Sequence, residues 1–132
     1  YRNRESLREP LKRFVEFMRL VYKKDLVALL QFAESLGKEP REQQKQWLQV
    51  SSLLMSQLLR MRHSALKTSL FAWFPDVPFQ PDGLARLLHE SLHYELQQLF
   101  LGALTDIQRN INSRIVLSDL GIAVMKLFAG RK

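Results

Sequence analysis

The sequence contains no cysteine, which excludes disulfide bonds and metal sites built on thiolates. This absence fits a cytoplasmic protein, although exported proteins can lack cysteine too. No apolar run reaches the roughly 18 to 20 residues that a membrane-spanning helix needs. The polar segment 1–5 is not followed by the apolar stretch of a signal peptide. We therefore expect a cytoplasmic protein that does not contact a membrane.

Glycine and proline are also scarce, with five of each, and they lie between segments of periodic apolar residues. This distribution is typical of a helical protein, because both residues weaken or end helices. The 132 residues are enough for one domain with its own core. We predict an all-α fold, a single compact domain of about five helices over 1–132. The chain does not begin with methionine, so we expect it to be the C-terminal fragment of a longer protein.

Apolar residues at helical spacing set the limits of the predicted helices, which are 6–22, 26–36, 40–65, 83–109 and 113–128. Asp25 is predicted to cap the second helix, with Leu26, Leu29, Leu30, Ala33 and Leu36 as its apolar stripe. Gly37 then ends that helix, as a residue free to adopt positive φ would. Asn112 or Ser113 is predicted to cap the last helix.

Residues 68–81 differ from the rest because aromatic residues alternate there with prolines. The aromatic residues are Phe71, Trp73, Phe74 and Phe79, and the prolines are Pro75, Pro78 and Pro81. Such a loop either plugs the core between helices or exposes its rings to a partner. The sequence leaves these two roles open.

The last predicted helix is apolar on nearly every side. Its apolar residues are Ile115, Val116, Leu117, Leu120, Ile122, Val124, Met125, Leu127 and Phe128. A helix of this kind must be covered on all sides, and a small domain does not easily enclose its own C-terminal helix. We therefore expect part of this helix to contact another subunit.

Positive charge is concentrated in the first half of the chain. Residues 1–70 hold 14 Lys and Arg against 7 Asp and Glu, whereas residues 71–132 hold 6 of each kind. A basic half could attract nucleic acid or an acidic partner. The alternative is a solvated helix surface, which the interspersed Glu5, Glu9, Glu16, Glu39 and Glu42 favour.

Signatures of chemistry are few. The chain has neither a P-loop nor a G-x-G-x-x-G motif, so no phosphate cradle is recognisable. His89, Glu90 and His93 form an H-E-x-x-H pattern, which in zinc peptidases supplies two metal ligands and a general base. We interpret this pattern as coincidental, because no third metal ligand is evident. Asp106 and Asp119 are candidates for it by residue type only. Leu96 and Leu99 stand where the extended metzincin motif needs Gly and His, and no strands are predicted to hold a substrate. We predict no catalytic residue, metal or cofactor.

Two parts of the sequence resemble a known family. The first comprises 14–22 (FVEFMRLVY) and 24–30 (KDLVALL), followed by 35–37 (SLG) and 41–45 (REQQK). The second is 107–120 (IQRNINSRIVLSDL), which departs from the family in having Ser113 where proline is common. These segments resemble the C-terminal collar domain of the delta-prime subunit of the bacterial DNA polymerase III clamp loader. The similarity covers about half of the chain, and residues 71–106 match only loosely.

The resemblance implies a non-catalytic assembly domain that joins delta and the tau/gamma subunits in a five-membered collar. Two ATPase-like domains would precede it, and contacts with DNA and the sliding clamp would be indirect, through the complex. The implied subunit interface includes Asn110, Asn112, Arg114, Ile115, Ile122 and Met125. The neighbours in the collar, the oligomeric state of the isolated domain and a delta or tau/gamma identity stay open. Alternatives are another helical interaction or nucleic-acid-binding module and, last, a zinc metallopeptidase.

Overall fold

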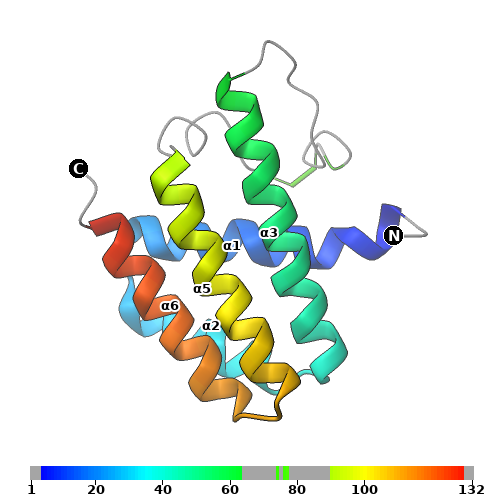
Figure 1. Ribbon diagram of the computed structural model, residues 1–132. Helices are drawn as coiled ribbons and strands as arrows, with labels where there is room; N and C mark the ends of the chain where they lie inside the picture. The colour runs from blue at the N-terminus through cyan, green and yellow to red at the C-terminus, as the bar shows by residue number, and fades with distance from the viewer. Residues whose placement is uncertain (1–3, 64–73, 75, 78–89, 130–132) are drawn as a thin grey trace.

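The computed structural model describes residues 4–63, 74, 76, 77 and 90–129. A short 3-10 helix, η1 (Arg4–Leu7), leads into the described α-helices, which are α1 (Arg8–Lys23), α2 (Leu26–Gly37), α3 (Arg41–His63), α5 (Glu90–Gln108) and α6 (Ser113–Ala129) (Figure 1). The described residues contain no strand, so the predicted all-α fold is confirmed for them. None of the described helices is both long enough and apolar enough to span a bilayer.

The helices form two layers. In Figure 1, α3, α5 and α6 lie side by side and alternate in direction, while α1 crosses behind them. The packing partners agree with this view, since α3 contacts α5, α5 contacts α6, and α1 contacts both α3 and α6. The shorter α2 packs against α6 and α1. The connection between α5 and α6 is only four residues long, which forces these two helices to be antiparallel neighbours.

An aromatic cluster lies where α1, α2, α3 and α5 meet. The ring centroid of Phe17 lies 5.3 Å from that of Trp47 and 6.0 Å from that of Phe100. Phe32 completes the cluster, 5.7 Å from Phe17 and 5.6 Å from Trp47. Edge-on and tilted pairs at such distances add about 0.5–1.5 kcal/mol each beyond the burial of their area. This cluster therefore fixes how four of the helices pack.

The predicted apolar stripe of α2 is only partly correct. Leu29, Ala33 and Leu36 are buried as expected. Leu26 and Leu30 were predicted to be buried with them but are exposed, at 44% and 37% of their surface. The physical reason is that α2 packs mainly against α6 and α1, and these neighbours leave Leu26 and Leu30 uncovered. The five predicted residues together cover more of the surface of α2 than the neighbouring helices bury.

Both ends of α2 lie where they were predicted, but one of them is formed differently. The Asp25 carboxylate accepts a hydrogen bond of 3.1 Å from the Ala28 N–H, as expected of a helix cap. The helix ends at Gly37, as predicted, but Gly37 does not have the positive φ expected of it. Among the described residues, positive φ occurs at Lys24 and Asn110. Glycine is needed at position 37 for a different reason, the close approach of Arg114, which is described below.

Several predictions fall outside the described residues. The fourth predicted helix began near Gly83, but residues 83–89 are not described and α5 begins at Glu90. Of the aromatic loop, Phe71, Trp73 and Phe79 lie outside the described part. Phe74 is only 2% exposed, and the Arg8 guanidinium lies 4.7 Å from the centre of its ring. For Phe74, the role of a core plug is thus confirmed.

Candidate functional site

Buried Gln44 joins the C-terminal end of α2 to the first turn of α3. Its side-chain amide donates to the carbonyl oxygens of Glu39 at 2.9 Å, Gly37 at 3.2 Å and Leu36 at 3.3 Å. Carbonyls at the end of a helix have no partner within the helix, so a donor from elsewhere must satisfy them. One buried amide serves the whole corner between the two helices. The resembling segments 35–37 and 41–45 are thereby held together.

The same corner is bonded to the second resembling segment, 107–120. The Arg41 guanidinium donates to the Ile107 carbonyl oxygen at 3.0 Å, and this carbonyl belongs to the last turn of α5. Arg114, in the first turn of α6, forms an ion pair of 2.8 Å with Glu34 of α2. Residues 66 and 80 positions apart in the sequence are therefore joined in one structural unit at one end of the bundle.

Two isoleucines lie at the surface where α5 leads into α6, one in the connection and one in the first turn of α6. Asn110 takes the left-handed conformation, with φ of 64°, and turns the chain after α5. The side-chain oxygen of Asn112 accepts from the N–H groups of Arg114 at 3.0 Å and Ile115 at 3.3 Å, so Asn112 is the predicted cap. Ile111 and Ile115 flank this cap and are 43% and 58% exposed. Two large aliphatic side chains exposed beside one capped turn make it a candidate contact surface.

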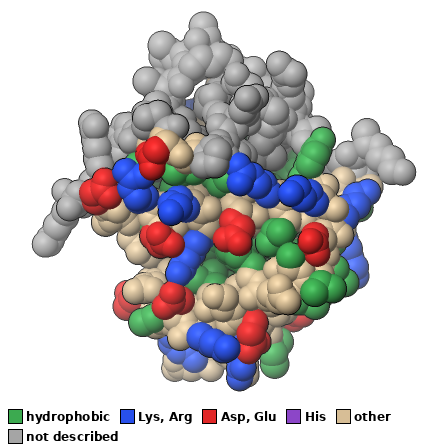
Figure 2. All heavy atoms as spheres, turned by 180° about the vertical axis from the view of Figure 1, so that it is seen from behind, with side chains coloured by type: hydrophobic (Ala, Val, Ile, Leu, Met, Phe, Trp, Pro, Cys, Tyr) green, Lys and Arg blue, Asp and Glu red, His purple; other side chains and the backbone are tan. Residues whose placement is uncertain are grey.

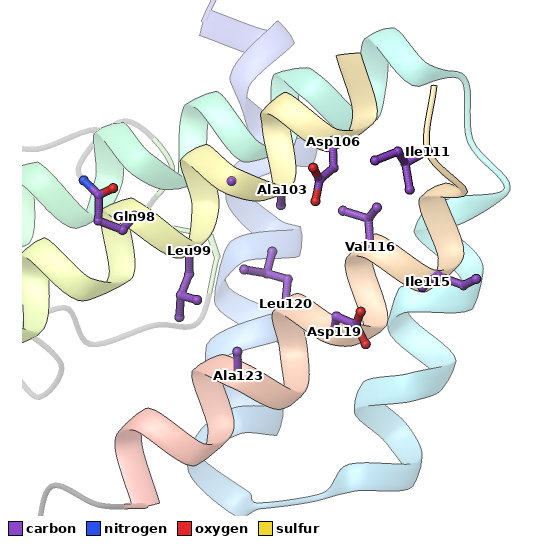
Figure 3. A pocket seen from close by; sticks show the side chains of 11 residues that line it. Gln98, Leu99, Ala103, Asp106, Ile111, Ile115, Val116, Asp119, Leu120 and Ala123 are labelled. Carbon is purple, nitrogen blue, oxygen red and sulfur yellow. The ribbon is translucent and has the colours of Figure 1, made fainter. Parts of the chain in front are cut away.

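A groove lies between α5 and α6 beside these isoleucines (Figure 3). Its volume is about 340 Å³. We call it the α5–α6 groove, and it is lined by Gln98, Leu99, Gly102, Ala103, Asp106, Ile111, Ile115, Val116, Asp119, Leu120 and Ala123. Most of these side chains are apolar, so the groove offers a partner a surface that water does not solvate well.

A second hollow adjoins the groove on the α2 side of α6. It is lined by Glu34, Asn112, Arg114, Ile115, Ser118 and Asp119. Ile115 and Asp119 line both hollows, so the two form one continuous surface over the first turns of α6. A partner that covers Ile115 would reach both hollows at once.

The structure brings some of the six predicted interface residues together and separates others. Asn112, Arg114 and Ile115 line this continuous surface, and Asn110 is exposed in the turn that precedes it. Ile122 and Met125 line neither hollow and are half-buried, and Met125 packs against the core. Much of the apolar surface of α6 is thus covered by the chain itself, mainly by α2 and α5.

The groove also contains two carboxylates that sequence reasoning considered only as metal ligands. Asp106 is half-buried on α5, and Asp119 is exposed on α6. Neither side chain forms an ion pair or hydrogen bond with the part of the chain that the structure describes. One feature of the sequence could have pointed to Asp106 as a binding residue. It lies in the last turn of α5, where a negative charge opposes the helix dipole.

His93 of the H-E-x-x-H pattern belongs to a polar cluster between α3 and α5. Its Nε2 lies 3.1 Å from the Gln97 amide nitrogen and 3.3 Å from the Ser56 hydroxyl. The Gln97 N–H₂ also donates to the Ser52 carbonyl oxygen at 2.9 Å, which ties α5 to α3. Burial lowers the pKa of His93, so the neutral ring is favoured. Glu90 is exposed, and His89 lies outside the described residues.

Through these contacts, Nε2 of His93 helps to hold α5 against α3. A neutral ring that accepts a hydrogen bond through Nε2 uses the lone pair that a metal would need. Within the described residues, no three His, Asp or Glu side chains lie close enough to hold a metal ion together.

Many charges of the basic first half are paired. Arg13 forms an ion pair of 2.7 Å with Glu39, and Lys45 forms one of 2.6 Å with Glu42. Arg8 pairs with Glu5 at 3.0 Å and also with Asp76. Figure 2 shows acidic and basic side chains interspersed across the face that includes α1 and α2. This mixture is typical of a solvated helix surface.

A second apolar area lies at the corner between α1 and α2. It consists of Tyr22, Leu26, Val27 and Leu30, which are exposed. The residues between them, Lys23, Lys24 and Asp25, carry charges of both signs. Because both signs of charge are present, the charge at this corner does not indicate which kind of partner would bind. The α5–α6 groove differs in holding carboxylates only.

Comparison with known proteins finds no family model, no curated protein and no solved structure that matches this chain. Its function must therefore be argued from its residues and their geometry.

Proposed function

We propose that this chain is a non-catalytic assembly domain that packs in the pentameric collar of a DNA polymerase III clamp loader, as a delta-prime subunit does. In the cytoplasm it would bind tau/gamma and delta subunits and so hold the loader together while a sliding clamp is loaded for DNA replication. Contacts with DNA and with the clamp would be indirect, through the complex.

The exposure of Ile111 and Ile115 beside the α5–α6 groove carries this proposal. Both residues lie in segment 107–120, which has the stronger resemblance to the collar domain. The turn that presents them is held by the Asn112 cap and by the bond from Arg41 to the Ile107 carbonyl. A rigid apolar surface loses little conformational entropy when a partner covers it, which favours a stable assembly.

The resembling residues also have structural roles that a chance match would not require. Gln44, Gly37 and Arg114 contact one another's helices at a single corner of the bundle. This arrangement supports reading the matched segments as parts of one fold, and a shared fold would bring a shared manner of assembly.

The test is capture of tau/gamma and delta from the same organism by this chain, measured as an apparent Kd. The variant Ile111→Ser/Ile115→Ser removes the exposed aliphatic groups without changing the charge. Because burying an aliphatic side chain contributes about 1.5–3 kcal/mol, we expect capture to weaken by at least tenfold. The matched control is Leu101→Ser, since Leu101 on α5 is 55% exposed but does not line the groove.

Three results decide the proposal. Capture by the wild-type chain and by Leu101→Ser, but not by the double variant, would support it. Failure of the wild-type chain to capture either subunit would overturn it. Equal capture by all three proteins would show that another surface assembles the complex. Circular dichroism on each variant establishes that the helices are intact.

A further inference from the structure

The shape of the α5–α6 groove fits a helix. On α5 the lining residues recur at positions 98–99, 102–103 and 106, and on α6 at 115–116, 119–120 and 123. Both series repeat every three to four residues, so two ridges run along the groove for about two turns. A third helix packs its own ridge between two such rows. A peptide that binds by strand addition needs the edge of a sheet, and the described residues form no strand.

The centre of the groove is also open enough for close approach. A Cβ built on Gly102 meets nothing within 4 Å, and Ala103 and Ala123 add only methyl groups. Leu99, Val116 and Leu120 add larger apolar side chains to the lining, and Figure 3 shows Leu120 between Ala103 of α5 and Ala123 of α6. A partner helix can therefore insert aliphatic side chains into the groove without displacing side chains of this domain.

The charge of the groove indicates that a partner should carry positively charged side chains. Asp106 and Asp119 come from different helices and line the same groove, and neither is paired with a described residue. Asp106 lies in the last turn of α5, where a negative charge opposes the helix dipole. The Arg41 guanidinium lies at the same helix end, but it is bonded to the Ile107 carbonyl oxygen and not to Asp106. A negative charge at the C-terminal end of a helix is unfavourable by itself. A cation on a partner bound in the groove would offset that cost.

From this shape and charge we infer that the α5–α6 groove receives an amphipathic helix of a neighbouring subunit, with aliphatic side chains in the groove and Lys or Arg on Asp106 and Asp119. The inference rests on the proposed function and adds to it the chemistry of the partner. The two carboxylates would repel a phosphate backbone or an acidic helix. The groove therefore selects a basic partner even though the domain itself is basic.

The first experiment uses the clamp-loader subunits. Asp106→Asn/Asp119→Asn keeps the size of both side chains and removes both charges. We expect the apparent Kd for the captured subunit to rise by about tenfold at low salt, and the difference to shrink near 1 M salt, where charges are screened. The matched control is Glu90→Gln, which removes an exposed charge from the first turn of α5, away from the groove. Wild-type capture with no effect of the double variant overturns this inference and leaves the proposed function standing.

The second experiment does not depend on the clamp loader. The probes are two fluorescein-labelled, end-capped helical peptides with Leu at every third or fourth position, flanked by Lys in one and by Glu in the other. Fluorescence anisotropy should show saturable binding of the Lys peptide to this chain. We expect that binding to be lost with Asp106→Asn/Asp119→Asn and with Gly102→Gln, which fills the open part of the groove. Binding of neither peptide, or equal binding of both, overturns the inference.

Sedimentation of the chain alone tests one further occupant, a second copy of this chain. A monomer is expected. A dimer that dissociates in the Asp106→Asn/Asp119→Asn variant would identify a second copy as the occupant and would overturn the neighbouring-subunit inference.

Discussion

Gly37 at the end of α2 lies directly against Arg114 in the first turn of α6. A Cβ built on Gly37 would lie 2.4 Å from Cγ of Arg114, 3.1 Å from its Cα and 3.2 Å from its backbone nitrogen. The first of these distances is too short for any real contact, and the other two involve backbone that cannot move by side-chain rotation. The absence of a side chain at position 37 is what lets α2 and α6 pack at this end.

This contact predicts opposite effects for alanine at two glycines. Gly37→Ala should destabilise the fold by about 1–3 kcal/mol, because overpacking outweighs the gain in helix propensity. Gly102→Ala should stabilise it by about 0.5–1 kcal/mol, because Gly102 lies inside α5 with open space around it. Urea unfolding of both variants measures the two changes. Equal behaviour of the two would contradict the helix packing described here.

Gln44 predicts a second change in stability. Gln44→Ala leaves the carbonyls of Leu36, Gly37 and Glu39 without their shared donor in a buried corner. The Leu36 carbonyl keeps the Glu39 N–H as a donor, whereas the part-buried carbonyls of Gly37 and Glu39 lose the Gln44 amide. Losing donors at such groups costs about 1–3 kcal/mol, so thermal unfolding should shift to a lower temperature. Gln43→Ala is the control, since Gln43 is exposed on the same turn and should tolerate the change.

The cap of α6 offers a smaller and more local test. Asn112→Ala removes the acceptor of two backbone N–H groups and should cost about 1 kcal/mol. Asn112→Ser keeps a side-chain oxygen for capping and should recover most of that loss. Hydrogen exchange should be faster in the first turn of α6 for the alanine variant than for the serine variant.

His93 predicts a dependence of stability on pH. Burial lowers the pKa of His93 in the folded state below its ordinary value of 6.5. The unfolded chain therefore binds a proton more readily, so the contribution of His93 to stability falls as the pH drops from that value through the folded-state pKa. His93→Gln cannot titrate, and its free energy of unfolding should fall less between pH 7 and pH 5 than that of the wild type. Parallel pH profiles for the two proteins would rule out this role.

Much of the fold followed from local patterns. Apolar spacing and caps predicted the described helices to within a few residues at most ends, because helix formation depends on neighbours three or four positions away. Asp25 was predicted as a cap for the same reason, and Asn112 was one of two candidates together with Ser113. These signals lie within a single helix and its first turn, so they do not depend on what the rest of the chain does.

The candidate site followed from the sequence less fully. Ile115, Asn112 and Arg114 were expected at an interface and do line one continuous surface, but Ile122 and Met125 are half-buried away from it. Apart from the cap residue Asn112, these residues lie on α6, and composition does not say which side of a helix its neighbours will cover. Asp106 and Asp119 were noticed by residue type, but their meeting in one groove depends on how α5 and α6 pack.

The sequence by itself determined that this chain is helical, where its helices lie and which of their residues are apolar enough to form a core. Tertiary structure decided that Gly37 makes a close contact with Arg114 without adopting positive φ, that Gln44 donates to the last two carbonyls of α2 and to that of Glu39, and that Leu26 and Leu30 stay exposed. The physical reason is distance along the chain. Periodicity and capping act between close neighbours in sequence, whereas a groove or a helix contact joins residues whose proximity exists only after the helices pack.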